Sequence, residues 1–444
     1  MIGHRRVDPT RGPVREAVRR LAVPAVAATL IQGLFNVVDT FWVGRGLGPA
    51  ALAGVSTAGF AVWLVLSVSE LPAVGLTAVA SRRWGEGRPE DSARAVYQAF
   101  LLGLLVAAGL GAIGLLGLPG LFLLMDTPGD VTLHGGRYLG TYLVGIPVVF
   151  SYFVMDSAFR AAGDTRTPFL LLAASLAANA VLDPLLILGP GPIPRLETQG
   201  AALATVITRA AGCAAGFVLL RRRGWIRRSA PELRLLGRMA WIGLPVAAGG
   251  AVFSLVYILL TRLTSDFGTA ALAALGVGHK VESLSYMACI GFGLSAATVV
   301  GQNLGAGRPD RAAAAGREAL RYALMVTVAV AVAFLLVPGT LVGVFTTDPA
   351  VIDAGSSYLR IVAVAQVFMA MELVLQIAME GAGHTVPPMI VTVLLTAARL
   401  PLAAALRGPL GLAGIWWTIS ATSVARGAAM AGIWRRRRWV GRDL

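Results

Sequence analysis

The chain has 444 residues, of which 56% are hydrophobic and only 14% are charged, and its formal net charge is +15. Soluble domains contain about a quarter charged residues, so this composition excludes a soluble globular protein and predicts a polytopic membrane protein. The apolar stretches lack the alternating polarity of a transmembrane barrel. We attribute the excess positive charge to the membrane surface, and we expect membrane lipids and no nucleic acid as partners.

Apolar stretches of about 20 residues, the length that a spanning helix needs, recur along the whole chain. They predict an all-α polytopic membrane protein with twelve transmembrane helices. In chain order the expected spans are Leu21–Val43, Ala50–Ala80, Val96–Leu118, Tyr138–Ala162, Pro168–Leu188, Gly200–Leu220, Met239–Thr261, Ala270–Val300, Leu320–Val342, Tyr358–Gly381, Pro387–Leu406 and Leu412–Trp434.

The distribution of arginine predicts the orientation. Alternate loops and both termini contain most of the arginines, whereas each loop on the other side contains one. The positive-inside rule therefore places both termini in the cytoplasm of a multi-pass protein of the cell (inner) membrane. The basic amino-terminal segment lacks a short apolar core with a cleavage site, so we expect it to be retained.

The two halves of the chain repeat each other at an offset of about 220 residues. Six spans per half is an even number, so both halves share an orientation and are related by a parallel pseudo-twofold axis, with a central cavity between two six-helix lobes. The identities hold one register through glycine-proline turns: Gly85, Gly87, Arg88 and Pro89 reappear as Gly305, Gly307, Arg308 and Pro309.

This repeat predicts five regions. They are a basic cytoplasmic amino terminus at 1–20, an N-lobe at 21–220, a cytoplasmic linker at 221–238, a C-lobe at 239–434 and a basic cytoplasmic tail at 435–444. Each lobe has a proline inside its first span, Pro24 or Pro245. An interior proline removes a backbone hydrogen bond and kinks the helix, so Pro24 is a candidate hinge.

Two carboxylates in the first half are the main functional candidates. Asp39 lies inside a span, where an ionised group costs about 3 kcal/mol or more unless it faces protein or water. It lies about 18 residues from the cytoplasmic end, about 27 Å at the helical rise, and Asp183 in the fifth span lies at about 22 Å. Asn179 is on the same face as Asp183, and Gln32 is two turns before Asp39. These groups suit a proton or a hard cation such as Na⁺, and the alternative is a static hydrogen-bonded network.

The second half has Leu259 at the position equivalent to Asp39. Its weaker candidates are Lys280, Glu282, Glu372 and Gln376, and an ion pair of Lys280 with either acid is equally compatible with the pattern. Asp156, in the first half, is expected to pair with Arg160 one turn away. The four histidines form no metal-ligand pair and no glycine-rich phosphate loop occurs, so we expect no enzyme, no cofactor and no metal beyond Na⁺ at the Asp39 site.

Four stretches resemble the multidrug and toxic compound extrusion (MATE) transporters, in particular their DinF-like branch. The similarity extends over about Leu21 to Trp434, and the stretches are Asn36–Gly44, Arg160–Pro168, Asn179–Pro184 and Val300–Gly307. The resemblance implies a two-lobed exporter that exchanges inward H⁺ or Na⁺ for outward movement of amphipathic, often cationic compounds.

By the same resemblance, Asp39, Asn179 and Asp183 match the cation site of the N-lobe. Gln32, Phe35, Asn36 and Asp156 are the candidate residues of the substrate cavity, and Phe35 stands where relatives have Tyr. We expect a monomer with small-molecule substrates. Two alternatives stay open: a flippase for lipid-linked oligosaccharides on a related scaffold, and a membrane-embedded polyprenyl transferase. The latter is expected to have acids clustered in cytoplasmic loops, which here are rich in arginine.

Overall fold

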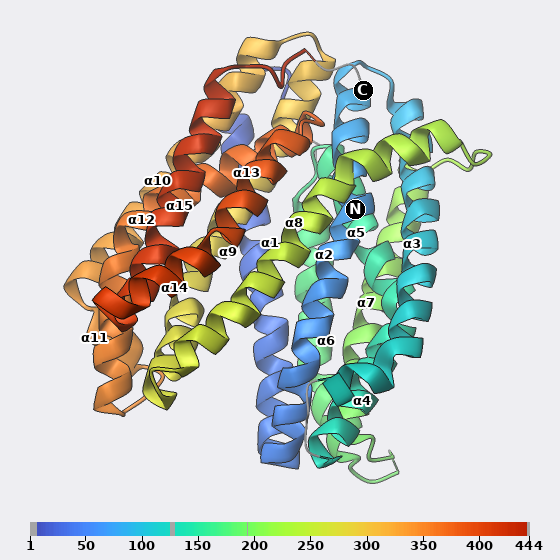
Figure 1. Cartoon of the computed structure of the whole chain (residues 1–444). Helices are drawn as coiled ribbons and strands as arrows, with labels where there is room; N and C mark the ends of the chain where they lie inside the picture. The colour runs from blue at the N-terminus through green and yellow to red at the C-terminus, as the bar shows by residue number, and fades with distance from the viewer. Residues whose placement is uncertain (1–6, 125–128, 193, 442–444) are drawn as a thin grey trace. The chain divides into compact units, whose positions relative to one another are not determined.

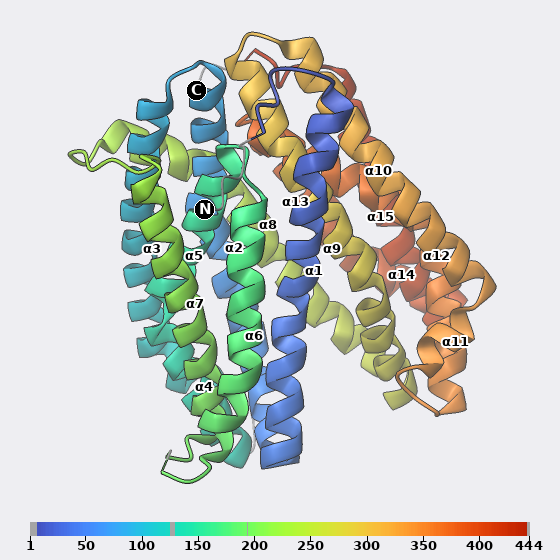
Figure 2. The same cartoon turned by 180° about the vertical axis from the view of Figure 1, so that it is seen from behind.

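The structure is a computed structural model that describes residues 7–124, 129–192 and 194–441, and every regular element in these ranges is a helix. The helices form two compact units (Figures 1 and 2). The first unit includes Ala27–Ala247, and the second includes Asp8–Val26 together with Ala248–Leu444. The predicted all-α fold is therefore confirmed.

In the first unit, α2 packs against three neighbours, α3, α4 and α5, and α7 packs against α4, α5 and α6. Buried aliphatic and aromatic side chains from these helices, among them Phe150, Tyr138 and Leu139, form its core. The helices span α2 Pro49–Gly85, α3 Pro89–Leu124, α4 Gly129–Val144, α5 Ile146–Ala161, α6 Arg166–Leu188 and α7 Glu197–Arg222.

In the second unit, α12 is central and packs against α9, α10, α11 and α15. Its core includes Tyr358, Trp416 and Phe334, which are almost fully buried. The helices span α9 Thr269–Gly305, α10 Pro309–Leu336, α11 Pro338–Gly343, α12 Pro349–Gly381, α13 Val386–Ala397, α14 Arg399–Leu410 and α15 Leu412–Arg435.

Two helices contribute residues to both units. Helix α1, Val14–Leu47, changes unit after Val26, and helix α8, Leu233–Ser265, changes unit after Ala247. Relative to the predicted lobe boundaries, residues 21–26 thus belong to the second unit and residues 221–247 to the first. The change of unit comes two residues after Pro24 in α1 and two residues after Pro245 in α8.

Within the described ranges, ten helices are long and apolar enough to cross a membrane, and the pair α4 and α5 makes eleven. Helix α15 takes the place of the twelfth expected span. Two expected spans differ in detail from the structure. Tyr138–Ala162 is bent by 53° between α4 and α5, because Pro147 has no N–H for the carbonyl of Leu143. Pro387–Leu406 divides into α13 and α14, since Pro401 likewise has no N–H for the carbonyl of Ala397.

The internal repeat is also visible in the backbone of the turns. Gly87 and Gly307 precede α3 and α10 with φ of 73° and 67°. Gly163 and Gly383 follow α5 and α12 with φ of 87° and 73°. Residues with a Cβ rarely adopt these left-handed angles, so each turn requires glycine in both halves.

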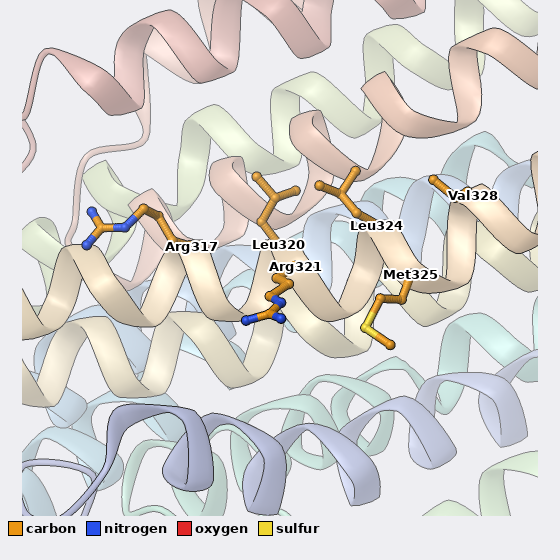
Figure 3. A pocket seen from close by; sticks show the side chains of 6 residues that line it. All are labelled: Arg317, Leu320, Arg321, Leu324, Met325 and Val328. Atoms are coloured by element: carbon orange, nitrogen blue, oxygen red, sulfur yellow. The ribbon is translucent and has the colours of Figure 1, made fainter.

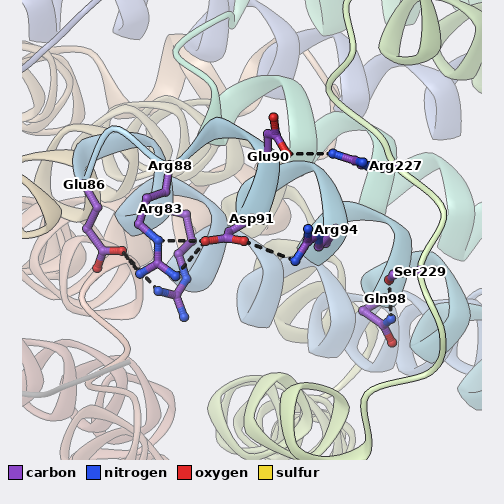
Figure 4. Close-up of polar contacts among 9 residues, drawn as sticks. All are labelled: Arg83, Glu86, Arg88, Glu90, Asp91, Arg94, Gln98, Arg227 and Ser229. Atoms are coloured by element: carbon purple, nitrogen blue, oxygen red, sulfur yellow. Dashed lines mark hydrogen bonds and ion pairs between the residues drawn. The ribbon is translucent and has the colours of Figure 1, made fainter.

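The segments that precede α1 and α8 are each held by side chains of other helices. The residues before α8 contact α3, and the residues before α1 contact the turn between α9 and α10. In the first unit, Arg227 pairs with Glu90 at 2.6 Å, and Gln98 donates to Ser229 at 2.8 Å (Figure 4). The same view shows the ion pairs around Asp91 and Glu86 in the α2–α3 turn. In the second unit, the carbonyls of Pro9, Thr10 and Gly12 accept hydrogen bonds from the end of α9 and the start of α10, with Asn303, Arg308 and Arg311 as the donors.

The outward face of α10 has an open hollow of about 590 Å³ that is mostly apolar (Figure 3). Arg317 and Arg321 lie at one end, and apolar side chains continue toward Val328. The described residues that line it include no carboxylate and none of the residues predicted as a site.

Glycines on α7 allow it to approach α6 closely. A Cβ on Gly200 would lie 2.5 Å from the carbonyl oxygen of Leu186, and one on Gly212 would lie 2.6 Å from the hydroxyl of Ser175. Small residues at such positions let two membrane helices pack backbone to backbone. This contact is what brings the polar groups of the next section together.

We therefore predict that Gly200→Ala lowers the melting temperature of the protein in detergent, because the new methyl group meets backbone atoms that cannot move aside. Overpacking of this kind costs about 1–3 kcal/mol. Gly109→Ala on α3 is the matched control, since nothing lies within 4 Å of its Cβ position. Equal melting temperatures for the two variants would refute the close contact.

Candidate functional site

The two predicted carboxylates of the first unit are joined by one amide. The Asn179 side-chain nitrogen donates to Asp39 Oδ1 at 2.9 Å and to Asp183 Oδ2 at 2.8 Å. Asp39 is 4% exposed, and Asn179 and Asp183 are fully buried. Asp39 comes from α1 and the other two residues are one turn apart on α6, beside it in Figure 2. The structure thus brings the three predicted residues together.

Helix α7 completes this cluster with two threonines that the sequence analysis missed. Thr205 donates to Asp39 Oδ2 at 3.1 Å, and Thr208 lies 3.3 Å from the amide oxygen of Asn179. Ser175 ties the two helices by donating to the carbonyl of Thr208 at 3.1 Å. A signal for Thr205 existed: it begins the sixth predicted span, at the same depth as the end of the fifth, where Asp183 lies.

One carboxylate oxygen in the cluster has no donor. The two N–H bonds of Asn179 and the hydroxyl of Thr205 satisfy three of the four oxygens. Asp183 Oδ1 is buried and receives no hydrogen bond from any described residue. A buried polar atom without a partner is rare and requires an explanation. An oxygen that takes up a proton is one such explanation.

A buried arginine lies next to the acids. Arg209, one turn after Thr205, is 3% exposed, and its guanidinium carbon lies 5.1 Å from the ring centre of Phe35 and 5.5 Å from that of Tyr152. It interacts electrostatically with Asp39. Its Nε and Nη1 are buried and make no hydrogen bond within the described part of the chain. Phe35, a predicted cavity residue, therefore contacts a cation.

The other candidates of the first half lie outside this cluster. Gln32 is half-buried on α1 and has no hydrogen bond to a described residue. The side chain of Asn36 is outside the described residues. Asp156 forms the expected ion pair with Arg160, whose other amino group donates to Ser157 at 2.9 Å. Pro24 lies inside α1, close to the change of unit.

The weaker candidates of the second half form a charge-balanced network. Glu282 accepts hydrogen bonds from Tyr358 at 2.8 Å and from Gln366 at 2.9 Å. Glu372 pairs with the buried Arg426 at 2.8 Å. Arg399 donates at 2.8–3.0 Å to three hydroxyl groups, those of Thr422, Tyr257 and Ser423.

The expectation that Lys280 could pair with Glu282 or Glu372 is wrong. Lys280 is exposed on α9, and Glu372 pairs with Arg426 instead. The spacing of residues along one helix could not predict the partner of Glu372, because Glu372 lies on α12 and Arg426 lies on α15. Gln376 stays close to the polar network: it donates to Glu380 at 3.1 Å and accepts from Thr392 at 3.2 Å.

The buried polar clusters of the two units therefore differ in net formal charge. Asp39, Asp183 and Arg209 together have a net formal charge of −1, whereas the two negative charges of Glu282 and Glu372 are matched by Arg399 and Arg426. A buried net charge is costly in a low dielectric, and one bound monovalent cation would neutralise the first cluster. The described residues contain no group of three or more His, Cys, Asp or Glu side chains suited to a metal ion.

Comparison with known proteins is consistent with this two-unit organisation. The MatE family model matches residues 24–185 and again residues 245–405. The family repeat therefore occurs twice, and each copy begins at the proline inside the first helix of its half. The predicted internal repeat is confirmed.

Curated relatives and solved structures are similar over almost the whole chain. A probable multidrug resistance protein NorM of Thermotoga maritima is 27% identical, over 97% of this chain and 95% of the relative. A FAD transporter of Shewanella oneidensis is 26% identical, over 94% and 93%. A MOP superfamily transporter of Pyrococcus furiosus has the same fold, with a TM-score of 0.91 at 21% identity over 99% of this chain and 100% of that one.

The family model matches well over half of the chain, in both units, and Asp39, Asn179 and Asp183 lie within the first matched region. The chain is a multi-pass membrane protein of the multidrug and toxic compound extrusion (MatE) family, and it is a transporter and not an enzyme.

Proposed function

We propose that this protein is a secondary active multidrug exporter of the inner membrane. It exchanges inward protons for outward movement of amphipathic, often cationic organic compounds, and Asp39, Asn179 and Asp183 form its coupling site. Relatives named as multidrug resistance proteins support the substrate class. The observation that carries the coupling site is the single amide bridging two buried carboxylates, with Asp183 Oδ1 left without a donor.

The orientation of Asn179 favours a proton over Na⁺. Its NH₂ group points at both carboxylates, and its oxygen lies 3.3–3.4 Å from the hydroxyl groups of Thr208 and Thr205. A metal ion between the acids would meet N–H bonds, whereas it requires oxygen ligands. A proton on Asp183 requires no change in the amide. Na⁺ coupling would require the amide to turn over.

Coupling requires that the ion and the substrate favour different conformations. A proton that enters from outside stabilises one state, and a bound drug stabilises the other. One charge that moves through 100 mV yields about 2.3 kcal/mol, enough for a drug gradient of roughly forty-fold. We propose Pro24 as a hinge of this motion, because α1 changes unit two residues after it.

Two alternatives from the sequence are less well supported. Membership of a transporter family disfavours the polyprenyl transferase. Relatives with multidrug names favour drug export over a flippase for lipid-linked sugars. A third candidate, export of an anionic flavin, is favoured by the FAD transporter among the relatives and by the buried guanidinium of Arg399, which donates hydrogen bonds to hydroxyl groups.

Transport into everted vesicles distinguishes the two substrate classes. We expect ethidium, an amphipathic cation, to accumulate when a pH gradient is applied, and FAD not to accumulate. Vesicles with no expressed transporter are the control. Uptake of FAD with no uptake of ethidium would replace the cationic substrate class with the anionic one.

For the coupling site we predict that Asp39→Asn folds and binds ethidium but no longer exports it in response to a pH gradient. The substitution keeps the shape and some hydrogen bonds but removes the charge. Proteoliposomes with separate pH and Na⁺ gradients measure this, together with ethidium binding. Export at the wild-type rate with the same ion dependence would make Asp39 a structural residue.

Glu372→Gln in the second unit is the matched control. The substitution leaves Arg426 buried without its carboxylate, and breaking a buried pair lowers the free energy of unfolding by about 3–5 kcal/mol. We therefore predict a lower melting temperature. Export by the protein that still folds should keep its dependence on the ion gradient. If export by Glu372→Gln no longer depended on the ion gradient while export by Asp39→Asn still did, the coupling site would lie in the second unit.

The proposed orientation predicts the result of reporter fusions. A cytoplasmic reporter after Arg223 and one at the carboxyl terminus should both be active, and an external reporter near Gly191 should be active. The arginine-rich linker cannot cross the membrane readily. An external signal after Arg223 would contradict the parallel arrangement of the two halves.

A further inference from the structure

We propose that Arg209 is a resident counter-ion of the coupling site. Its guanidinium group alternates between the rings of Phe35 and Tyr152 and the carboxylates of Asp39 and Asp183, so that the site exchanges a single proton. This inference rests on the proposed proton coupling and adds the residue that sets its stoichiometry and pH range.

The first support is that unpaired donors and an unpaired acceptor are buried in the same unit. Arg209 Nε and Nη1 have no acceptor, and Asp183 Oδ1 has no donor, among the described residues. Each such atom is costly when buried, at about 1–3 kcal/mol, so a second arrangement that pairs them is favourable. In the present arrangement the aromatic faces stabilise the guanidinium, at 5.1 Å and 5.5 Å.

The second support is position. Arg209 follows Thr205 by one helical turn, and Thr205 donates to Asp39. Residues four apart lie on one face of a helix, so the long arginine side chain projects from the face that already contacts the acids. Its helix is held against α6 by the close contacts of Gly200 and Gly212. The backbone is therefore fixed, and only the side chain has to move.

The third support is the charge count. With one proton on the carboxylate pair, the cluster is neutral; without it, the cluster has one negative charge and an arginine able to pair with it. The O–H bond breaks, the proton leaves to water, and the guanidinium replaces it. The other titratable groups that interact with Asp39 or Arg209 are Tyr138 and Tyr142 on α4 and Tyr152 on α5. Tyr152 in turn interacts with Asp156, Arg160 and Cys213.

The test is the dissociation constant of ethidium measured against pH on the purified full-length protein. In wild type, ethidium binding should weaken below one midpoint pH, because the drug and the proton favour different states. We predict that Arg209→Met moves this midpoint to higher pH by about one unit or more, since an opposite charge within 4–6 Å alters proton affinity by about that much. Arg209→Lys keeps the charge and should leave the midpoint within a few tenths of a unit.

Phe35→Leu tests the alternation independently, and it remains informative if the Arg209→Met variant does not fold. Without the ring, the guanidinium spends more time on the carboxylates, so the midpoint should move to lower pH, opposite to Arg209→Met. An unchanged midpoint in the Arg209 and Phe35 variants, while Asp39→Asn abolishes the pH dependence, would overturn the role of Arg209 alone. If Asp39→Asn retains the wild-type pH dependence, the proposed proton coupling itself fails.

Discussion

The structure of the first unit depends on one amide group that donates to two carboxylates. Asn179 holds Asp39 and Asp183 at 2.9 Å and 2.8 Å, and nothing else in the cluster joins α1 to α6 as directly. Two acids that share a buried donor affect each other's affinity for a proton, so they act as a pair. Because Asp39 and Asp183 belong to different helices, a change of protonation acts on the contact between α1 and α6.

The two halves repeat each other in structure, but the pair of carboxylates joined by an amide belongs to the first half. Both halves share turns, glycine conformations and helix order, yet their buried charges differ. In the second unit, Arg426 neutralises Glu372, and Tyr358 and Gln366 donate to Glu282. In the first unit, among the residues that the structure describes, Arg209 is the one cation that acts on Asp39, and Asp183 adds a second acid. Under the proposed function, a common scaffold thus holds a charge-balanced polar core in one half and a proton-exchanging one in the other.

The sequence predicted the fold well because its signals are physical necessities in a membrane. A span needs a long apolar stretch, and a left-handed turn needs glycine, as at Gly87 and Gly307. The depth argument also brought Asp39, Asn179 and Asp183 together correctly.

The residues that were missed have weaker signals than a carboxylate inside a span. Threonine is common in membrane helices, so Thr205 and Thr208 were not distinguished. Arg209 could not be given a partner from the sequence, because its contacts with Phe35 and Tyr152 join three helices. The partner of Glu372 was wrong for the same reason: Arg426 is distant in sequence and adjacent only in the folded unit. The motif Arg160–Pro168 forms the turn between α5 and α6, where Asp164 pairs with Arg223 at 2.6 Å.

The most direct measurement is the release of protons when ethidium binds to the purified protein in weakly buffered solution. If the buried carboxylates are the coupling site, linkage requires that drug binding expel protons, and the reaction should acidify the solution by about one proton for each drug bound. The same titration of the Asp39→Asn, Asp183→Asn double variant should release none. Equal release from wild type and the double variant would contradict the account.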